Sequence, residues 1–134
     1  MKNARSYVLI IEVGRPMEIE IGQLRKVKFE PGTYAYVGSA LRGIEARLRR
    51  HLRKKKRAHW HIDHLLGHQD VRVKGAYVLE TTEAMECRVA QALAREFPVV
   101  SGFGSSDCRC KGHLFRCKES SLLRTLRRIG FNPF

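Results

Sequence analysis

A tyrosine, a glycine break and a basic helix edge follow one another between residues 32 and 57. Tyr36 lies in a run that alternates as a strand does, and this run breaks at Gly38. On the helix predicted next, Arg47 and His51 lie along one edge of the apolar seam, because each follows a seam residue by three positions. A phenol, a guanidinium and an imidazole at one strand–turn–helix junction indicate a site for phosphate chemistry.

The charge of the chain indicates a polyanionic partner. Lys and Arg outnumber Asp and Glu by 26 to 13 over 134 residues, which gives a net charge of +13. Residues 42–57 hold nine Lys and Arg against Glu45 alone, whereas a charged thermophilic surface mixes both signs. A solvated helix face is the alternative interpretation of this run. We expect nucleic-acid phosphates to be contacted by Ser39, Arg42, Arg49, Arg50, Arg53, Lys54, Lys55, Lys56 and Arg57.

Glu86 is an acid on the apolar stripe of a predicted helix. We expect this helix to follow an N-cap at Thr81-Thr82, with Glu83 in its first turn, and to end near Phe97. A buried carboxylate is costly unless it is paired or binds a cation. A salt bridge to an arginine and a metal ion are therefore both open interpretations of Glu86.

Three of the four cysteines crowd into ten residues. The spacing C-x-C-x2-H-x3-C, formed by Cys108, Cys110, His113 and Cys117, could hold zinc, with Cys87 as another possible ligand. The paired C-x2-C knuckles typical of zinc sites are missing, so free cysteines packed under a loop are the alternative. In a cytoplasmic protein this crowding suits a metal or redox cluster better than a disulfide framework.

Hydrophobic periodicity predicts an α+β fold in a single compact domain spanning residues 1–134. A small, mostly antiparallel sheet is expected, with core strands at residues 6–13, 32–40 and 71–79. In the third strand we expect one face to carry Val71, Val73, Gly75, Tyr77 and Leu79. Flanking helices are expected at about residues 43–56, 58–66, 83–97 and 120–129. An inserted edge hairpin is predicted at about residues 17–29, and a Cys/His-bearing loop at about 99–117.

The chain shows neither of the usual membrane signals. No apolar run approaches the ~20 residues of a membrane span, and the N-terminus lacks the small-residue cleavage site of a signal peptide. A soluble cytoplasmic protein is therefore expected.

The order of these elements and of their polar residues resembles the GIY-YIG nuclease superfamily, which includes homing endonucleases and the incision domain of excision repair. The residues that carry the resemblance are, in chain order, Tyr7, Tyr36 with Val37 and Gly38, Arg47, His51 and Glu86. The segments YVGSALRG, WHIDHLL and GFGSSDCRCKGHLF are similar to the small stand-alone Uri-type endonuclease branch. The likeness covers nearly the whole chain.

The resemblance implies a catalytic set of five residues, namely Tyr7, Tyr36, Arg47, His51 and Glu86. Tyr7 and Tyr36 match the two motif tyrosines, although Arg5-Ser6 stand where the GIY triplet would begin. Arg47 matches the helix arginine, and His51 the position that holds Tyr or His. Glu86 matches the metal-binding acid and would hold Mg²⁺ or Mn²⁺.

The asparagine that the family carries late in the chain has no convincing match here. The only Asn after Glu86 is Asn132, close to the C-terminus. Ser105, Ser106 or Asp107 is left as its replacement.

The resemblance implies a divalent-metal-dependent endonuclease that hydrolyses phosphodiester bonds, with DNA favoured over RNA. Arg47 would stabilise charge on the reacting phosphate, and a tyrosine or His51 would accept the proton of the attacking water. Which of these groups is the base stays open. Two other functions are open: a non-catalytic, basic nucleic-acid-binding module, and a zinc-stabilised, RNA-associated structural protein.

Overall fold

β1 (Ser6–Val13) is the central strand and pairs along its whole length on both sides. In the computed structural model, which describes residues 4–106 and 108–134, β4 (Gly32–Ser39) and β5 (Val71–Leu79) flank it in antiparallel register. Two short strands, β6 (Leu114–Cys117) and β7 (Asn132–Pro133), complete the sheet, whose order is β6-β4-β1-β5-β7. The predicted α+β fold with three core strands is confirmed.

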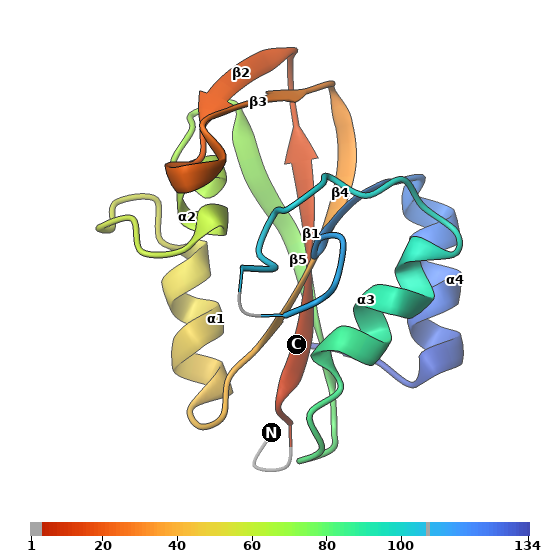
Figure 1. Ribbon diagram of the computed structural model, residues 1–134. Coiled ribbons are helices and arrows are strands. Elements are labelled where there is room, and N and C mark those ends of the chain that lie inside the picture. Colours follow the sequence, from red (N-terminus) through yellow and green to blue (C-terminus); the bar gives the residue numbers. More distant parts are fainter. Residues whose placement is uncertain (1–3, 107) are drawn as a thin grey trace.

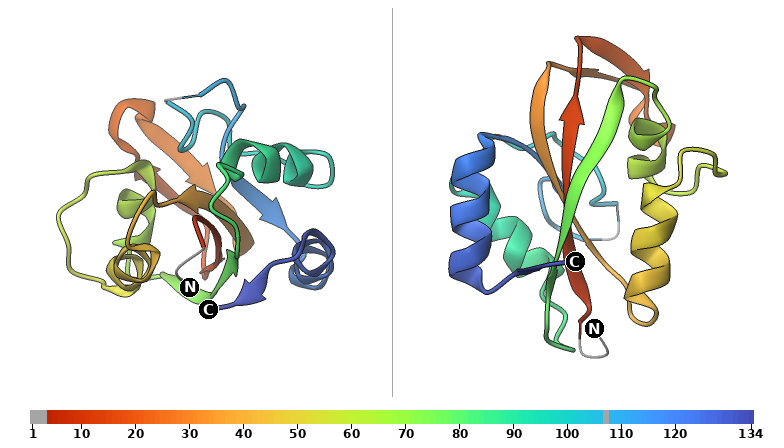
Figure 2. Two further views of the ribbon diagram at one scale, coloured as in Figure 1. Left: turned by 90° about the horizontal axis from the view of Figure 1, so that it is seen from below. Right: turned by 180° about the vertical axis from the view of Figure 1, so that it is seen from behind.

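Helices cover both faces of this sheet (Figures 1 and 2). α1 (Ile44–Leu52) and α2 (His61–Leu66) lie on one side, and α3 (Glu86–Ala94) and α4 (Glu119–Ile129) lie on the other. Successive side chains of β1 point to opposite faces, so this strand supplies both cores. Tyr7 and Leu9 pack with α1 and α2, whereas Val8 and Ile10 pack with α3 and α4. Burial on both faces explains why β1 is apolar at almost every position.

A bulge in β5 overturns the expectation that its alternate residues share one face. Ile10 of β1 pairs with Gly75, but Ile11 pairs with Val73, so Lys74 is an extra residue in the ladder. Val73 packs with the α1 side, whereas Tyr77, beyond the bulge, packs with the α3 side. The inserted residue reverses the facing of every later side chain.

The predicted insertion at residues 17–29 forms a hairpin that is a sheet of its own. β2 (Met17–Glu20) and β3 (Lys26–Phe29) pair antiparallel and are joined through a short 3-10 helix, Gly22–Leu24. Apolar residues of the hairpin pack onto the α1 and α2 core, and its Glu and Lys residues alternate on the outer side. The hairpin therefore lies over the end of the main sheet (Figure 1).

The first two helices are shorter than the sequence predicts. α1 ends at Leu52 rather than at residue 56, because Arg53 is extended and Nζ of Lys56 returns to bind the carbonyl of His51 at 3.1 Å. α2 begins at His61 rather than at residue 58. The carboxylate of Asp63 fixes this start, because it accepts the backbone N–H groups of His59 and Trp60, at 2.8 and 3.0 Å.

The third helix also begins later than predicted. The hydroxyl of Thr81 accepts the backbone N–H of Glu83 in a local turn and caps no helix, so α3 begins at Glu86 and ends at Ala94. α4 confirms the predicted C-terminal helix. The expected loop at 99–117 ends instead in β6, which pairs with β4, and β7 was not predicted at all. No helix in the described parts of the chain combines the length and apolarity needed to cross a bilayer.

Candidate active site and metal centre

Tyr7 and His51 form a buried hydrogen-bonded pair. Their side chains come from β1 and α1, and Oη of Tyr7 lies 2.7 Å from Nε2 of His51. Burial raises the pKa of Tyr7, although the charge of Arg47 opposes this, and burial lowers the pKa of His51 to about 4. At neutral pH both groups are therefore uncharged, and either can be the donor, depending on which ring nitrogen of His51 carries the proton.

The Tyr7 ring leaves no room for a side chain at Gly38 of the YVG motif. The two residues are direct partners across β4 and β1, and the Tyr7 ring lies over the glycine. A Cβ at residue 38 would lie 2.4 Å from Cζ of Tyr7, which is closer than any side chain tolerates. Glycine is thus needed for the close approach of the ring, and the strand continues through this position to Ser39.

Tyr36 lies on β4, two residues before Gly38, and is on the same face of the sheet as Tyr7. Its ring centroid is 6.4 Å from that of Tyr7 and 6.2 Å from that of His51. Phe103, from the loop before β6, packs edge-on against it. Burial raises the pKa of Tyr36 well above its usual value, so this phenol too is neutral.

Arg47 is held beside this aromatic group by two contacts. Its Nη1 donates to the backbone oxygen of Ser39 at 2.9 Å, and its guanidinium lies 4.4 Å from the ring centroid of Trp60. Arg50 also contacts Trp60, but it is committed to Asp63 through two hydrogen bonds of 2.8 and 3.0 Å. Of these two arginines, Arg47 is therefore the one available to the site, and Arg50 positions the residues around it.

Glu86 brings a carboxylate to this group from the first turn of α3. Burial by itself raises its pKa, but His113, the Ser39 hydroxyl and Arg47 outweigh this and hold the pKa below its usual range. Glu86 is ionised at neutral pH, and its side chain remains 28% exposed. The charge of Glu86 also raises the pKa of Tyr7 and of Tyr36, as expected for neighbours. Tyr7, Tyr36 and His51 therefore lie together, with Arg47 and Glu86 near enough for their charges to act on Tyr7.

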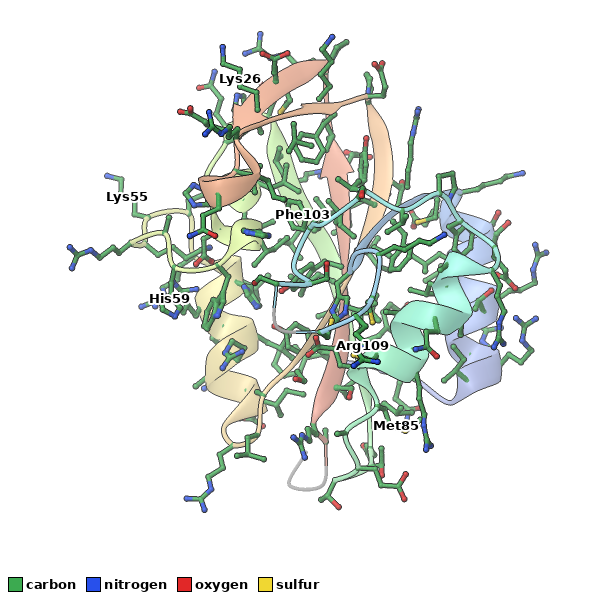
Figure 3. All side chains as sticks on the ribbon, viewed as in Figure 1. Lys26, Lys55, His59, Met85, Phe103 and Arg109 are labelled. Atoms are coloured by element: carbon green, nitrogen blue, oxygen red, sulfur yellow. The ribbon has the colours of Figure 1, made fainter. Side chains whose placement is uncertain are left out.

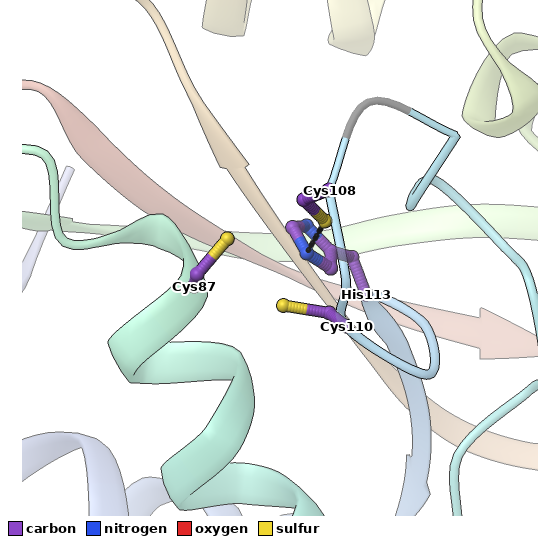
Figure 4. A group of neighbouring side chains, drawn as sticks. All are labelled: Cys87, Cys108, Cys110 and His113. Atoms are coloured by element: carbon purple, nitrogen blue, oxygen red, sulfur yellow. Dashed lines mark hydrogen bonds between the residues drawn. The ribbon is translucent and has the colours of Figure 1, made fainter.

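Four of the predicted metal ligands form a cluster next to Glu86 (Figure 4). Their ligand atoms all lie within 4.8 Å of one another, which is close enough to hold one metal ion; they are Cys87, Cys108, Cys110 and His113. Cys87 comes from α3, and the other three come from the loop before β6. Cys117 lies apart in β6, where its Sγ is 3.8 Å from the backbone oxygen of Thr33. The prediction that Cys117 is a ligand of this cluster is therefore wrong.

His113 connects this cluster to Glu86. Its Nε2 is 3.4 Å from Sγ of Cys108, and its Nδ1 is 2.8 Å from Oε2 of Glu86. The contact with Glu86 is short but bent away from the line of a hydrogen bond. His113 is 1% exposed, so both ring nitrogens face protein groups.

The predicted nucleic-acid contacts divide into exposed and engaged residues. Nζ of Lys54 donates to the backbone oxygens of Leu66 and His68 at 3.0 and 2.7 Å, and so ties α1 to the end of α2. Lys56 and Arg50 are similarly engaged, and the hydroxyl of Ser39 faces Glu86. Solvent-exposed side chains remain at Arg42, Arg49, Arg53, Lys55 and Arg57. Figure 3 shows Lys55 pointing away from the body of the molecule.

Two of the three residues considered as replacements for the missing asparagine, Ser105 and Ser106, lie in the described part of the chain. Ser106 lines a pocket of about 340 Å³ beside Tyr36, together with Trp60 and His61. Ser105 is buried and its backbone oxygen accepts the N–H of Cys108. Asp107 lies outside the described residues, and Asn132 sits in β7 at the far edge of the sheet.

Sequence reasoning missed the roles of Trp60 and Asp63. Asp63 lies three residues after the N-cap residue Trp60, where a capping box places its acid, but the Ser or Thr that completes the sequence signature is replaced by Trp60. No local signal indicates that the guanidinium of Arg47 lies over the ring of Trp60, because only the fold brings α1 and Trp60 together.

Comparison with curated proteins gave no significant match, and comparison with solved structures gave none either. One protein-family model does match, over residues 6–130, which include every residue of the site described above. The chain therefore belongs to the family described as "Domain of unknown function DUF123".

Proposed function

We propose that this protein is a divalent-metal-dependent endonuclease that hydrolyses phosphodiester bonds in nucleic acid, with DNA as the favoured substrate. The observation that carries the proposal is the 2.7 Å pair of Tyr7 Oη and His51 Nε2, with Arg47 and Glu86 close enough to affect the Tyr7 pKa. A buried acid–base pair, a cation and a carboxylate around one point are the groups that phosphate hydrolysis needs.

Tyr7 and His51 act as a proton relay in this proposal. In the tautomer of neutral His51 that carries its proton on Nδ1, Nε2 accepts the Tyr7 hydroxyl and leaves lone pairs on the phenolic oxygen, and the proposed relay starts from this tautomer. When water attacks phosphorus, its proton passes to Tyr7 and the Tyr7 proton passes to His51. The bond from phosphorus to the leaving oxygen breaks, and that oxygen takes a proton from solvent. The relay avoids a free phenolate, which burial makes costly. The charge of Asp63 favours the imidazolium that forms on His51.

Arg47 supplies positive charge where the phosphate becomes more negative. Its contacts with Ser39 and Trp60 hold the guanidinium before substrate arrives, so little reorganisation is needed during the reaction. Its neighbour Arg50 cannot take this role, because Asp63 already occupies two of its N–H groups.

Glu86 fits the binding of Mg²⁺ or Mn²⁺. It is ionised and partly exposed, and a hard carboxylate oxygen suits these ions, which retain much of their water. When bound there, such an ion would neutralise charge on the scissile phosphate and on the leaving oxygen.

The neighbouring cluster fits zinc better than either of these ions. Three thiols and an imidazole are the donors of a closed tetrahedral zinc site, and soft sulfur ligands disfavour Mg²⁺. A Cys₃His centre would tie the loop before β6 to the start of α3. Zinc is therefore assigned a structural role, distinct from that of the ion on Glu86.

The exposed cations offer a surface for the nucleic-acid backbone. Arg42, Arg49, Arg53 and Lys55 project from α1 and its flanking turns, the same segment that carries Arg47 into the site. Phosphate contacts of this kind position a strand without reading its sequence.

The test is nicking of supercoiled plasmid by the purified protein with Mg²⁺ or Mn²⁺. Glu86→Gln and Arg47→Ala should each lower the nicking rate by about 10²-fold or more, because each removes a transition-state charge contact. Glu83→Gln, an exposed acid three residues before Glu86, serves as the control and should nick at the wild-type rate. Full activity in Glu86→Gln would refute the mechanism.

The same assay separates the two other functions. A binding module would shift plasmid in a gel without nicking it in any divalent metal. A zinc-stabilised structural protein would hold stoichiometric zinc and lose stability on its removal, again without cleavage.

A further inference from the structure

Glu86 and Cys87 are consecutive residues, yet they serve different groups. Glu86 lies near enough to Arg47 for their charges to interact, whereas Cys87 lies among the cysteines of the loop before β6. His113 contacts both groups at once: its Nδ1 lies 2.8 Å from Oε2 of Glu86, and its Nε2 lies 3.4 Å from Sγ of Cys108. Figure 4 shows the second of these contacts. The active-site carboxylate and the thiol cluster are thus one side chain apart.

The main chain holds His113 rigidly in this position. Its N–H donates to the oxygen of Phe103 at 2.7 Å, and its oxygen accepts the N–H of Val37 at 2.9 Å. Val37 lies between Tyr36 and Gly38 of the catalytic strand, so β4 places the histidine and the tyrosines together. A buried ring with a fixed backbone has little freedom to release either contact.

We propose that His113 couples the two metal centres: zinc bound at Nε2 places the ring proton on Nδ1, and a small turn of the Glu86 side chain brings Oε2, already 2.8 Å away, into line with this N–H, which then positions the carboxylate for its own divalent ion. The ion on Glu86 rests on the proposed function, whereas the link between His113 and Glu86 does not. A metal on Nε2 leaves Nδ1 as the protonated nitrogen and therefore fixes the tautomer. A carboxylate that accepts this proton makes the imidazole a stronger ligand, as in other carboxylate–histidine–zinc arrangements.

Contact with His113 leaves Glu86 accessible to a divalent ion. Oε2 is the atom that lies 2.8 Å from Nδ1 of His113, and the side chain remains 28% exposed. Three thiolates outweigh the two charges of zinc, so the loaded cluster is negative and adds to the attraction of a second cation beside it. Binding at either centre should therefore favour binding at the other.

Zinc affinity tests the link without any nucleic acid. Zinc is competed from the wild-type protein and from Glu86→Ala with a chromophoric chelator. Loss of the acceptor for Nδ1–H should weaken zinc binding about 10-fold to 100-fold. Two matched controls should bind zinc as the wild type does: Glu83→Ala, which removes an exposed acid nearby, and Cys117→Ser, which removes the cysteine outside the cluster. Unchanged zinc affinity in Glu86→Ala would overturn the proposal.

His113→Cys tests the reverse direction. Four thiolates still bind zinc tetrahedrally, but the N–H of His113 is gone. The additional negative charge by itself favours a cation at Glu86, so a fall in Mn²⁺ affinity can come only from loss of this N–H. With zinc confirmed at one equivalent, Mn²⁺ affinity measured by electron paramagnetic resonance should fall several-fold relative to the zinc-loaded wild type. Equal Mn²⁺ affinity in the two proteins would refute the coupling.

The two experiments also distinguish the possible failures. If the wild type binds no Mn²⁺ at Glu86, the proposed nuclease site fails, and the zinc affinity of Glu86→Ala alone still decides whether His113 and Glu86 are linked. If Mn²⁺ binds and nicking is observed, but Glu86→Ala binds zinc as tightly as the wild type does, only the proposed coupling is wrong.

Discussion

The ring of Tyr7 covers Gly38 of the neighbouring strand so closely that a Cβ at residue 38 would lie 2.4 Å from Cζ of Tyr7. Gly38→Ala should therefore push the Tyr7 hydroxyl away from His51 and cost about 1–3 kcal/mol of unfolding free energy. Urea denaturation measures the cost. Gly75→Ala is the control, because a Cβ there meets no atom within 4 Å, and its effect should stay within about 0.5 kcal/mol. Equal effects of the two changes would contradict the close contact.

Removal of the Tyr7 hydroxyl should affect catalysis more than removal of the Tyr36 hydroxyl. Oη of Tyr7 bonds to His51, so Tyr7→Phe breaks the relay and should lower the nicking rate by about 10²-fold to 10⁴-fold. Tyr36→Phe keeps that pair, as well as the packing against Phe103, and should cost less. Initial nicking rates at one pH compare the two variants, and a larger loss in Tyr36→Phe would reassign the base to Tyr36.

His51 should make stability depend on pH. Burial lowers its pKa to about 4 in the folded protein, against about 6.5 in the unfolded chain. Between these values the unfolded chain binds more protons, so stability from this residue is complete above pH 6.5 and is lost as the pH falls towards 4. The full difference is at most about 3 kcal/mol. Urea unfolding from pH 7 to 4 should show a shallower slope for His51→Gln than for the wild type, while the exposed His59→Gln should keep the wild-type slope.

The ion pair between Arg50 and Asp63 should matter far more than the neighbouring surface pair. Asp63 is 4% exposed, accepts two N–H groups of Arg50 and caps α2, so Asp63→Ala should cost about 3–5 kcal/mol. Glu45 and Arg49 are 3.6 Å apart and exposed, so Glu45→Ala should cost less than about 0.5 kcal/mol. Thermal denaturation at matched salt concentration ranks the two.

Two adjacent lysines should separate binding from stability. Lys55 is exposed, so Lys55→Ala should weaken DNA binding and lower the slope of log K against log salt by about 1 without loss of stability. Lys54 instead binds backbone oxygens beyond α2, so Lys54→Ala should lower the melting temperature. Filter binding across a salt series and a melting curve for each variant decide this, and an unchanged salt slope in Lys55→Ala would remove it from the interface.

Zinc content should distinguish a cysteine of the metal cluster from Cys117, which lies outside the cluster. Cys110→Ser should lose stoichiometric zinc and melt at a lower temperature, because the loop before β6 is no longer tied to α3. Cys117→Ser should retain one zinc per chain, since Cys117 lies in β6 beside Thr33. Elemental analysis of both purified proteins checks this.

Local patterns in the sequence determined the core strands, the basic helix and part of the candidate site. A short apolar, β-branched run was sufficient for β1, alternation was sufficient for β4, and an apolar seam with Arg47 and His51 on its edge was sufficient for α1, because these features depend on residues a few positions apart. The assignment of Tyr7, Tyr36 and Glu86 to one site came from the resemblance, and the fold does place them together.

The tertiary structure decided what depends on contacts between distant residues. The bulge at Lys74 arises from pairing with β1, and β6 and β7 are strands because β4 and β5 offer open edges to them. Cys87 joins cysteines about twenty residues further along, and Cys117 is excluded although its spacing fits. The contact between Glu86 and His113 has no local signal at all, since packing of α3 against the loop before β6 creates it.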